Sequence, residues 1–525
     1  MNLVILHHHL NRGGVTQVIA NHLRALATLP ADEQPGRTAI VFDGQRDGWP
    51  DDLPGDGAAF PLELVVVPEL GYDVAGAPAE PRRLADTVAA ALEAQGFGAR
   101  DTLLHVHNHS LGKNVSWPGA LAELARRGWR TLLQVHDFAE DNRPANYQRL
   151  STAWISPTPE QIGGLLYPQA PHIHYATLTR RDADVLREAG VAAERLDSLP
   201  NPAAEFGPLP AAAEARERVF AKLGLPADAR LLVYPVRGIR RKNLGEMLLL
   251  AALAPADAYL AVTLAPKNPA EYVSFDCWNE LARRLHLRCR FDTGGEYGAG
   301  YHDMLAAADA ILTTSVAEGF GMVFLEAWLA GQMLVGRDLP EITREFRDEG
   351  VQFPHLYDRL AVPTEQIGAQ LFCDDLAATY RRVCGEYGLD PLDEEQFAER
   401  TSEFLADGCV DFGRLTPERQ DELIERTAGD ADVRQSLLAA NPGLADALTL
   451  RAGDEADCVA ANAAIVRDRY STATLGRRLA AAYRKLLDTN AAAEVTPLAN
   501  GRAVLDHFVT PERILPVRVA PWTTP

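Results

Sequence analysis

Short apolar runs alternate with longer stretches of helical periodicity through the first 350 residues, and this alternation constrains the fold more than any other feature of the sequence. Such a pattern predicts an α/β fold in which helices wrap both faces of a parallel sheet. Polar or glycine-containing turns follow several of the runs, as expected where a strand leads into a helix. The expected strands of the first part are 2–6, 38–42, 63–67, 102–106, 131–135 and 153–155, with a helix at about 15–28.

The alternation stops at Leu199-Pro200-Asn201-Pro202 and then begins again. Two further prolines, at positions 208 and 210, favour an interdomain linker here. The expected elements after it are strands at 231–234, 258–264, 288–291 and 310–314, and helices at 243–253, 276–286, 301–307 and 321–330. Two Rossmann-like, doubly wound domains follow from this order. Ligands of such folds bind at the carboxyl ends of the strands, so we expect the site in a cleft between the two domains.

The net charge limits the classes of partner. The chain has 51 basic and 72 acidic residues, a formal charge of −21, which argues against nucleic acid or an anionic membrane surface as a partner. No apolar run approaches the roughly 20 residues that would span a bilayer. Residues 341–470 alone contain 28 acidic and 13 basic residues. Most of the net negative charge therefore lies outside the two α/β domains. A small anion remains a reasonable ligand for a local basic cluster.

The chain divides into four expected regions. They are an N-terminal Rossmann-like domain at 1–200, a second at 201–355, an acidic helical insertion at 356–468, and a closing region at 469–525 whose amphipathic helix is expected at 471–487. The insertion is a candidate surface for self-association. The six cysteines form no C-x-x-C pair and no metal-ligand spacing, and the first residues predict a strand and not a signal peptide. We therefore expect a cytoplasmic location.

The segment from Ser315 to Ala327 contains two carboxylates between an expected strand and helix. Gly319 and Gly321 would let the backbone approach a ligand closely. Glu318 could then meet a sugar, and Glu326 could accept two hydrogen bonds from a vicinal diol such as a ribose. An ordinary strand–turn–helix, with Glu318 as a helix cap, is the plainer interpretation. The glycine pair and the preceding strand favour the functional one.

A basic turn, Arg237-Gly-Ile-Arg240-Arg241-Lys242, follows the first strand of the second domain. Arg237 and Lys242 flank the start of a helix, where cations and backbone N–H groups could hold a diphosphate. The turn is not a P-loop, because no G-x-x-x-x-G-K-[ST] occurs. Four basic residues in six usually form a solvated turn. The Glu318 segment in the same domain favours a binding role here.

The first domain offers weaker signals at the ends of its expected strands. Gln134-Val-His136-Asp137 ends one strand, and Arg12-Gly13-Gly14 opens the first helix with free backbone N–H groups. The candidate acceptor-binding residues are Arg12, Gly13, His107, His109, Lys113 and Arg143. Such groups suit a small hydroxylated acceptor, and the three cations among them suit an acidic one. The alternative is that His105 and His107, which alternate on one strand face, pack structurally.

With these motifs the chain resembles the retaining glycosyltransferases of the GT-B fold, in particular family 4. The resemblance covers about three quarters of the chain and is carried by Gly13-Gly14, His136-Asp137, Pro200-Asn201, the Arg237–Lys242 turn, the Glu318–Glu326 segment, Leu339-Pro-Glu-Ile342 and the helix near 470–487. It implies a nucleotide-diphosphate sugar donor and transfer of a hexose. It also implies catalytic roles for His136, Arg237, Lys242 and Glu318, and donor binding by Gly14, Arg237, Lys242, Glu318, Gly319, Phe320, Gly321, Met322, Val323 and Glu326.

In the mechanism that the resemblance implies, Arg237 and Lys242 stabilise the charge on the departing nucleotide. This electrostatic catalysis removes the need for a metal, so we expect no metal and no cofactor. Glu318 could instead act as a covalent nucleophile, but the family favours front-face transfer, in which the departing phosphate oxygen helps deprotonate the acceptor. Val236 departs from the family pattern, which usually has glycine there.

Two other functions remain open at this point. A phosphorylase of the same fold would bind inorganic phosphate at Arg237, Arg240, Arg241 and Lys242 and would need no nucleotide. A non-catalytic protein that binds nucleotide sugars would use the acidic helical insertion as its working surface. The intact pair of Glu318 and Glu326 favours an enzyme over this last alternative.

Overall fold

The computed structural model describes residues 1–53, 61–154, 157–203, 206–295, 298–491, 494–519 and 522 of the chain. Contacts between Cα atoms group the chain into two compact units. Unit 1 comprises Met1–Pro202, Glu386–Gly388 and Asp468–Val509; unit 2 comprises Ala203–Gly385, Leu389–Arg467 and Thr510–Pro525. The main chain passes from unit 1 to unit 2 at Pro202, in the proline-containing segment that was expected to be a linker.

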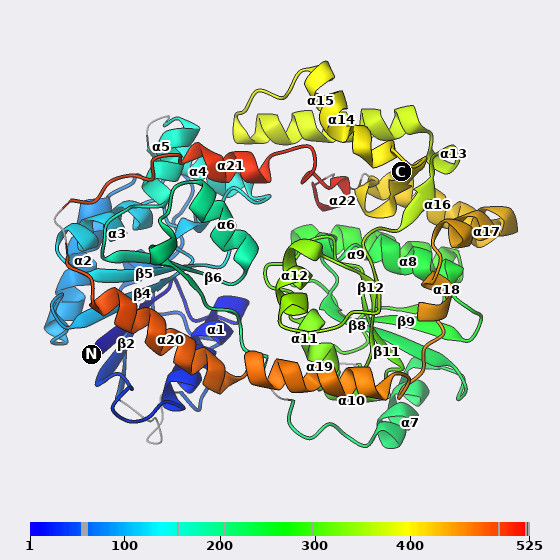
Figure 1. The fold of residues 1–525 in the computed structure, drawn as a ribbon, viewed down its shortest axis with the longest axis horizontal. Helices are drawn as coiled ribbons and strands as arrows, with labels where there is room; N and C mark the ends of the chain where they lie inside the picture. Colours follow the sequence, from blue (N-terminus) through cyan, green and yellow to red (C-terminus); the bar gives the residue numbers. More distant parts are fainter. Residues whose placement is uncertain are drawn as a thin grey trace. The chain divides into compact units, whose positions relative to one another are not determined.

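Unit 1 is built on a seven-stranded sheet in the order β3-β2-β1-β4-β5-β6-β7, in which every neighbouring pair is parallel (Figure 1). Its strands are β1 (Asn2–Leu6), β2 (Arg37–Phe42), β3 (Leu62–Val66), β4 (Thr102–His107), β5 (Arg130–Val135), β6 (Ile173–Thr177) and β7 (Leu196–Ser198). Its helices are α1 (Gly14–Ala27), α2 (Pro81–Ala94), α3 (Trp117–Arg126), α4 (Pro144–Ala153), α5 (Pro159–Leu166), α6 (Arg180–Glu188), α20 (Thr472–Leu487) and α21 (Arg502–Phe508).

The expected strands of unit 1 are confirmed to within a residue for β1 to β5, but the strand predicted at 153–155 is wrong. Residue 153 ends helix α4, and residue 155 lies outside the described residues. A proline at the first position of α4 fixes its start, because proline lacks the N–H that a helix leaves unsatisfied there. Strand β6 and the edge strand β7 were not predicted.

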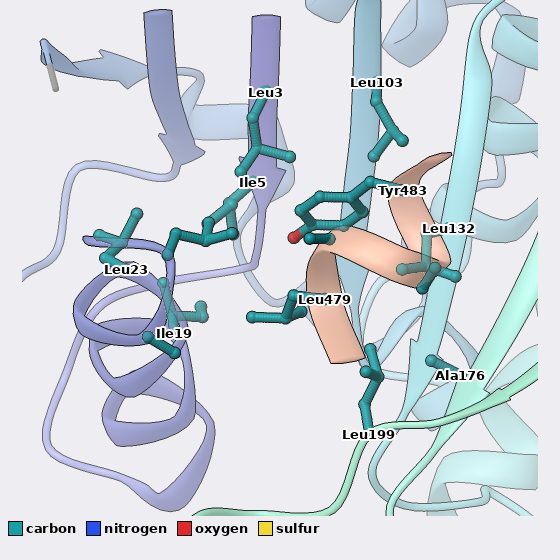
Figure 2. Close-up of a cluster of buried hydrophobic side chains, with 14 of the residues drawn as sticks. Leu3, Ile5, Ile19, Leu23, Leu103, Leu132, Ala176, Leu199, Leu479 and Tyr483 are labelled. Carbon is teal, nitrogen blue, oxygen red and sulfur yellow. The ribbon is translucent and has the colours of Figure 1, made fainter. Parts of the chain in front are cut away.

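The core of unit 1 lies between its central strands and two helices that come from opposite ends of the sequence, α1 and α20 (Figure 2). Leu3 and Ile5 of β1 and Leu23 of α1 pack in the same buried cluster as Leu479 and Tyr483 of α20. Burial of each such side chain stabilises the fold by roughly 1.5–3 kcal/mol. The predicted helix at 471–487 is confirmed as α20, and Ser471 caps it by accepting a hydrogen bond from the N–H of Thr474.

Unit 2 contains a six-stranded parallel sheet in the order β10-β9-β8-β11-β12-β13. Its strands are β8 (Arg230–Arg237), β9 (Ala258–Leu264), β10 (Cys289–Arg290), β11 (Ala310–Thr313), β12 (Leu334–Arg337) and β13 (His355–Tyr357). The helices around it are α7 (Ala212–Leu223), α8 (Leu244–Leu253), α9 (Pro269–Arg284), α10 (Tyr301–Ala307), α11 (Val323–Leu329) and α12 (Pro340–Asp348). The expected α/β fold class, with two doubly wound parallel sheets, is confirmed.

The stretch predicted to be helical and acidic contributes helices and one small antiparallel ribbon to unit 2. The ribbon pairs β14 (Ala361–Pro363) with β15 (Cys409–Asp411). The helices are α13 (Thr364–Ile367), α14 (Ala369–Tyr387, which ends in unit 1), α15 (Glu394–Thr401), α16 (Pro417–Gly429), α17 (Ala431–Ala440), α18 (Leu444–Ala447), α19 (Ala456–Arg469, which also ends in unit 1) and, near the C-terminus, α22 (Pro516–Val519). Among the described residues, no helix is both long enough and apolar enough to cross a bilayer.

Candidate active site

Two adjacent strands of unit 2, β8 and β11, bring the basic turn and the first carboxylate of the Glu318–Glu326 segment together. A 3₁₀ turn over Arg240–Lys242 follows β8, and Glu318 lies in the loop that follows β11. The ammonium group of Lys242 donates a hydrogen bond to Oε1 of Glu318, and both side chains are buried. The guanidinium of Arg241 lies 3.7 Å from Oε2 of the same carboxylate. The structure thus joins two of the residues that the sequence predicted separately.

Hydroxyl groups beneath this pair fix the turn and the carboxylate in place. Ser315 Oγ donates to Glu318 Oε1 at 2.6 Å, and Tyr234 and Ser315 share a hydrogen bond of 2.6 Å. Thr314 Oγ1 donates to the carbonyl oxygen of Lys242 at 2.9 Å. Buried polar groups that are satisfied in this way hold one geometry, because any displacement leaves a donor or acceptor without a partner.

The electrostatics of the pair keep Glu318 ionised. Burial alone would raise the pKa of Glu318, but the neighbouring Lys242 and Arg241 outweigh it and hold the pKa below its usual value. A carboxylate that stays charged at neutral pH is a hydrogen-bond acceptor and cannot serve as a general acid.

Glu326 is placed differently. It lies on α11, is partly buried, and its pKa is raised by burial. No ion pair or side-chain hydrogen bond holds its carboxylate among the described residues. Both of its oxygens are therefore free to accept hydrogen bonds from a ligand that carries two neighbouring hydroxyl groups.

Of the two glycines between the glutamates, Gly321 has a backbone conformation that other residues rarely adopt. Gly321 has φ of +82°, and a Cβ atom there would lie 2.6 Å from the ring of Phe324. A side chain at this position is thus excluded by both strain and space. The ring of Phe320 is buried against Phe346, with ring centroids 5.7 Å apart, while Met322 is partly exposed. Phe320 therefore presents only its backbone to a ligand.

Arg237, predicted to act with Lys242, is exposed and donates from Nη1 to the carbonyl of Ala265 at 3.3 Å. The backbone N–H of Arg240 donates to Glu271 Oε2 at 2.8 Å. Among the described residues, no hydrogen bond or ion pair joins Arg237 to Lys242 or Glu318. Its role in binding the diphosphate therefore stays a prediction.

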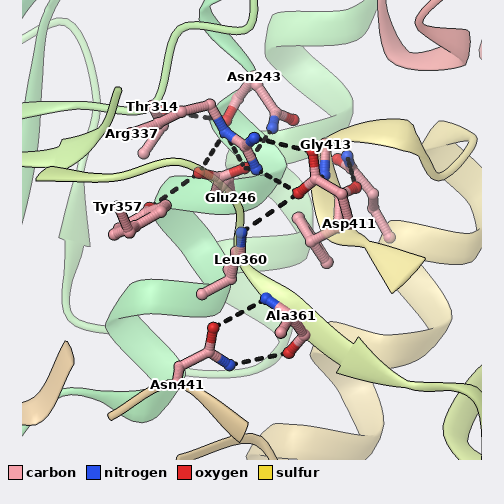
Figure 3. Close-up of polar contacts among 12 residues, drawn as sticks. Asn243, Glu246, Thr314, Arg337, Tyr357, Leu360, Ala361, Asp411, Gly413 and Asn441 are labelled. Carbon is pink, nitrogen blue, oxygen red and sulfur yellow. Dashed lines mark hydrogen bonds and ion pairs between the residues drawn. The ribbon is translucent and has the colours of Figure 1, made fainter. Parts of the chain in front are cut away.

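Sequence reasoning missed a buried ionic network directly behind the basic turn (Figure 3). Asn243 donates from Nδ2 to Glu246 Oε2 at 2.8 Å, and Tyr357 donates to Glu246 Oε1 at 2.8 Å. Arg337 donates to Glu246 and also to both carboxylate oxygens of Asp411. No local pattern could have found these residues, because Arg337 lies 91 residues from Glu246 and 74 from Asp411 in the sequence.

In unit 1, His136 follows β5 and is buried beside the last residue of β4. His136 Nε2 and His107 Nδ1 share a hydrogen bond of 2.9 Å. Burial lowers the pKa of His136 to about 4, so the imidazole is neutral at physiological pH. The next residue, Asp137, accepts from Arg143 Nη2 at 2.5 Å and from Asn108 Nδ2 at 3.3 Å.

The other predicted acceptor-binding residues fall into two groups. Arg12, Gly13 and Gly14 are exposed at the start of α1, where no side chain caps the helix. His107 and His109 are buried, and His109 Nε2 shares a hydrogen bond with the carbonyl of Leu166 at 2.9 Å. This burial favours a packing role for His107, which the sequence left as an alternative, and also for His109.

Of the predicted acceptor-binding cations, Lys113 and Arg143 lie close to each other in unit 1. The pKa of Lys113 is lowered by burial and by the nearby charges of Arg149 and Arg143. Lys113 also lies 5.5 Å from the centre of the Tyr72 ring. The structure therefore concentrates positive charge at this point of unit 1, including one cation, Arg149, that the sequence did not single out.

The chain is similar to proteins that carry out sugar chemistry. No protein-family model matches it. It is 26% identical over 375 residues to a mannosylglucosyl-3-phosphoglycerate synthase of Petrotoga mobilis, a match that covers 69% of each protein. Solved structures to which it is similar include the sucrose-phosphate synthase of Thermosynechococcus elongatus, with 16% identity, 93% of this chain and 99% of that chain covered, and a TM-score of 0.48. Another is HepE of Anabaena in complex with UDP and glucose, with 14% identity, 92% and 99% covered, and a TM-score of 0.46.

The two doubly wound sheets, each with polar groups after its central strands, are the architecture that the sequence led us to expect. The similarity to the Petrotoga synthase extends over more than two thirds of both proteins. Together these findings show a chain with two doubly wound parallel sheets that is similar, over more than two thirds of its length, to a mannosylglucosyl-3-phosphoglycerate synthase.

Proposed function

We propose that the protein is a retaining glycosyltransferase that moves a hexose from a nucleotide-diphosphate sugar to a small, acidic, hydroxylated acceptor. The observation that supports this most directly is the buried contact of Lys242 with Glu318 at the ends of β8 and β11. It places a cation suited to a phosphate beside a carboxylate suited to sugar hydroxyls. Glu326, whose carboxylate has no hydrogen bond or ion pair with any of the described residues, is the proposed contact to the ribose.

The proposed reaction relies on stabilising the departing nucleotide. We propose that Lys242 and Arg241 lie where the diphosphate would gain negative charge as the glycosidic bond breaks. Burial lowers the pKa of Lys242, and the carboxylate of Glu318 opposes this shift. Donors that are already in place at such a point typically contribute about 2.7–4 kcal/mol each to transition-state stabilisation. We propose Arg237 as an additional diphosphate contact, because it is exposed and its hydrogen bond to the carbonyl of Ala265 is long, at 3.3 Å.

Front-face transfer fits the state of Glu318 better than a covalent intermediate does. Its Oε1 accepts hydrogen bonds from both Lys242 and Ser315, and its pKa is held low. A carboxylate stabilised in this way is a weak nucleophile. We therefore propose that Glu318 binds the transferred sugar and that the departing phosphate oxygen accepts the proton of the acceptor hydroxyl. His136 remains a proposed contact to the sugar.

Two observations support an acidic acceptor. Lys113, Arg143 and Arg149 concentrate positive charge in unit 1. The Petrotoga relative is named for a phosphoglycerate, which is an acid. We propose that these cations bind the acidic group of the acceptor and that Arg12 and Gly13 contribute from the exposed start of α1.

A screen of nucleotide sugars tests this function. The purified protein is incubated with UDP, GDP and ADP sugars, with and without EDTA, and release of free sugar is followed by NMR, which also reports the anomeric configuration. We expect slow release from one donor, with retained configuration, at the same rate in EDTA. Turnover of a disaccharide with inorganic phosphate and no nucleotide would instead identify a phosphorylase. A lack of turnover and binding with every donor would contradict the proposal.

A further inference from the structure

Three charged side chains meet inside unit 2, and two of them have almost no exposure to solvent. Glu246 is 0% exposed and Arg337 is 4% exposed, while the side chain of Asp411, which contacts Arg337, is 15% exposed. Arg337 Nε donates to Glu246 at 2.9 Å, Nη1 donates to Asp411 Oδ2 at 2.9 Å, and Nη2 donates to one oxygen of each carboxylate at 2.7 Å. All three guanidinium nitrogens are thus engaged by the two carboxylates.

The three groups come from different parts of unit 2. Glu246 is on α8, Arg337 ends β12, and Asp411 ends β15 in the helical stretch that was predicted as an insertion. Asp411 is itself fixed, because its Oδ1 accepts from the backbone N–H groups of Leu360 and Gly413 at 3.2 and 3.1 Å. A Cβ atom at Gly413 would lie 2.9 Å from Arg337 Nη2, so the residue at this position must be small.

Glu246 connects this network to the basic turn of the proposed donor site. It accepts a hydrogen bond from the side chain of Asn243, the residue immediately after Lys242. Asn243 has φ of +47°, in the left-handed region, which is uncommon for residues other than glycine. The hydrogen bond to Glu246 stabilises that conformation, and the conformation sets the direction in which the chain leaves Lys242.

We propose that Asp411 is a positioning residue of the donor site, through which the helical stretch 356–468 fixes the turn that carries Lys242. The chain of contacts runs from Asp411 to Arg337, from Arg337 to Glu246, and from Glu246 to Asn243. This inference rests on the proposed function, because it assigns the turn to the diphosphate. It gives the helical stretch a role inside its own unit, in place of self-association.

A charge-removing variant, Asp411→Asn, tests the proposal with little change in volume. Arg337 then keeps one carboxylate partner and loses the other. We therefore expect the side chains of Arg337, Glu246 and Asn243 to change position together. Isothermal titration calorimetry with UDP, GDP and ADP would measure the Kd at a temperature where the protein is fully folded. We expect Asp411→Asn to bind the preferred nucleotide at least fivefold more weakly than the wild type.

The control variant must lower the stability of unit 2 without changing any residue that contacts Arg337 or Glu246. Asn462 is buried in unit 2 and exchanges two hydrogen bonds with the backbone of Gln352, at 2.9 and 2.8 Å. Asn462→Ala should therefore lower Tm while the nucleotide Kd changes less than twofold. If Asp411→Asn does not fold, Tyr357→Phe replaces it, because it removes only the 2.8 Å hydrogen bond to Glu246, and at least a twofold loss of affinity is expected.

The outcomes separate this inference from the proposed function. A wild type that binds none of the three nucleotides contradicts the proposed function itself. A wild type that binds one of them, with an unchanged Kd in a folded Asp411→Asn, or in Tyr357→Phe where that variant stands in, overturns the positioning role alone. An equal loss of affinity in Asn462→Ala also overturns it, because the loss would then follow from stability.

Discussion

The two units place chemically different groups after the central strands of similar sheets. In unit 1, β1 pairs with β4 and β4 with β5; in unit 2, β8 pairs with β11 and β11 with β12. The ends of β4 and β5 in unit 1 carry His107 and His136, which burial keeps neutral. The ends of β8 and β11 in unit 2 lead to Lys242 and Glu318, which form an ion pair.

This difference shows how one backbone architecture can serve two kinds of binding. A cation that is held in place before a ligand arrives suits a diphosphate, because a diphosphate is negatively charged and gains further negative charge as it departs. Neutral imidazoles suit hydroxyl groups, because they donate and accept hydrogen bonds without attracting an anion. Unit 2 is thus the expected donor unit. In unit 1, Lys113, Arg143 and Arg149 are the cations that we propose bind the acidic group of an acceptor.

The largest expected effect comes from breaking the charge balance of unit 2. Arg337→Met would leave Glu246 and Asp411 buried without their cation. Removing one partner of a buried ion pair typically costs about 3–5 kcal/mol. We expect Tm of the unit 2 transition to fall by several degrees or the variant to fail to fold. If calorimetry shows that the variant unfolds at the wild-type temperature, the ion pairs of Arg337 contribute little to stability.

The next effect concerns catalysis at the ion pair. Lys242→Ala removes the cation nearest to Glu318, and by the usual size of such a donor we expect kcat/KM to fall by about 10²–10³-fold. Arg513→Ala is the control, since Arg513 pairs with Glu341 on the surface of unit 2 at 2.9 Å. If both variants keep wild-type activity in a donor hydrolysis assay, the donor site lies elsewhere.

In unit 1, a buried carboxyl group should make stability depend on pH. Burial raises the pKa of Glu140 to about 7, although Tyr167 donates to both of its oxygens. The folded state therefore favours the protonated form, and its stability falls as pH rises from about 4.5 to about 7 and is constant above that. A shift of this size corresponds to about 3 kcal/mol.

Glu140→Gln should remove this dependence, because the amide oxygen can still accept from Tyr167. We expect the variant to be more stable than the wild type at pH 8 and similar to it at pH 4.5, as measured by the urea midpoint of unit 1. A difference between the two proteins that does not change with pH would contradict the raised pKa of Glu140.

The smallest expected effect tests the neutral histidines of unit 1. His22 is fully buried, and neither ring nitrogen has a hydrogen-bond partner among the described residues. Leaving such a group unsatisfied costs about 1–3 kcal/mol. His22→Leu, which is apolar and of similar size, should therefore raise Tm by a few degrees in thermal unfolding. A lower Tm would show that the imidazole has a bound partner in solution.

Local patterns were enough to predict most of the fold. Strands β1 and β8 contain uninterrupted apolar runs, and helix α20 has a hydroxyl cap and an apolar stripe. Strands β6, β7, β12 and β13 were missed, and three of them, β7, β12 and β13, are only three or four residues long. These segments become strands through pairing with a neighbour that is distant in the sequence, which no local window reports.

The same distinction holds for the site. Lys242 and Glu318 were predicted because each lies in a short motif after a strand. Glu246, Arg337 and Asp411 were not predicted, because each looks by itself like an ordinary polar residue on a helix or at a strand end. Only the fold brings them together. Because these charged groups lie inside the protein, removing one of them has a large effect on stability.

The central claim, that the charged strand ends of unit 2 hold the donor diphosphate, is tested most directly by nucleotide-induced thermal stabilisation. Wild type, Lys242→Ala, Glu326→Ala and Arg513→Ala are compared in the presence of UDP, GDP or ADP. We predict that one nucleotide raises the Tm of the wild type and of Arg513→Ala equally, and raises it much less in Lys242→Ala and Glu326→Ala. Equal shifts in all four proteins would contradict the claim.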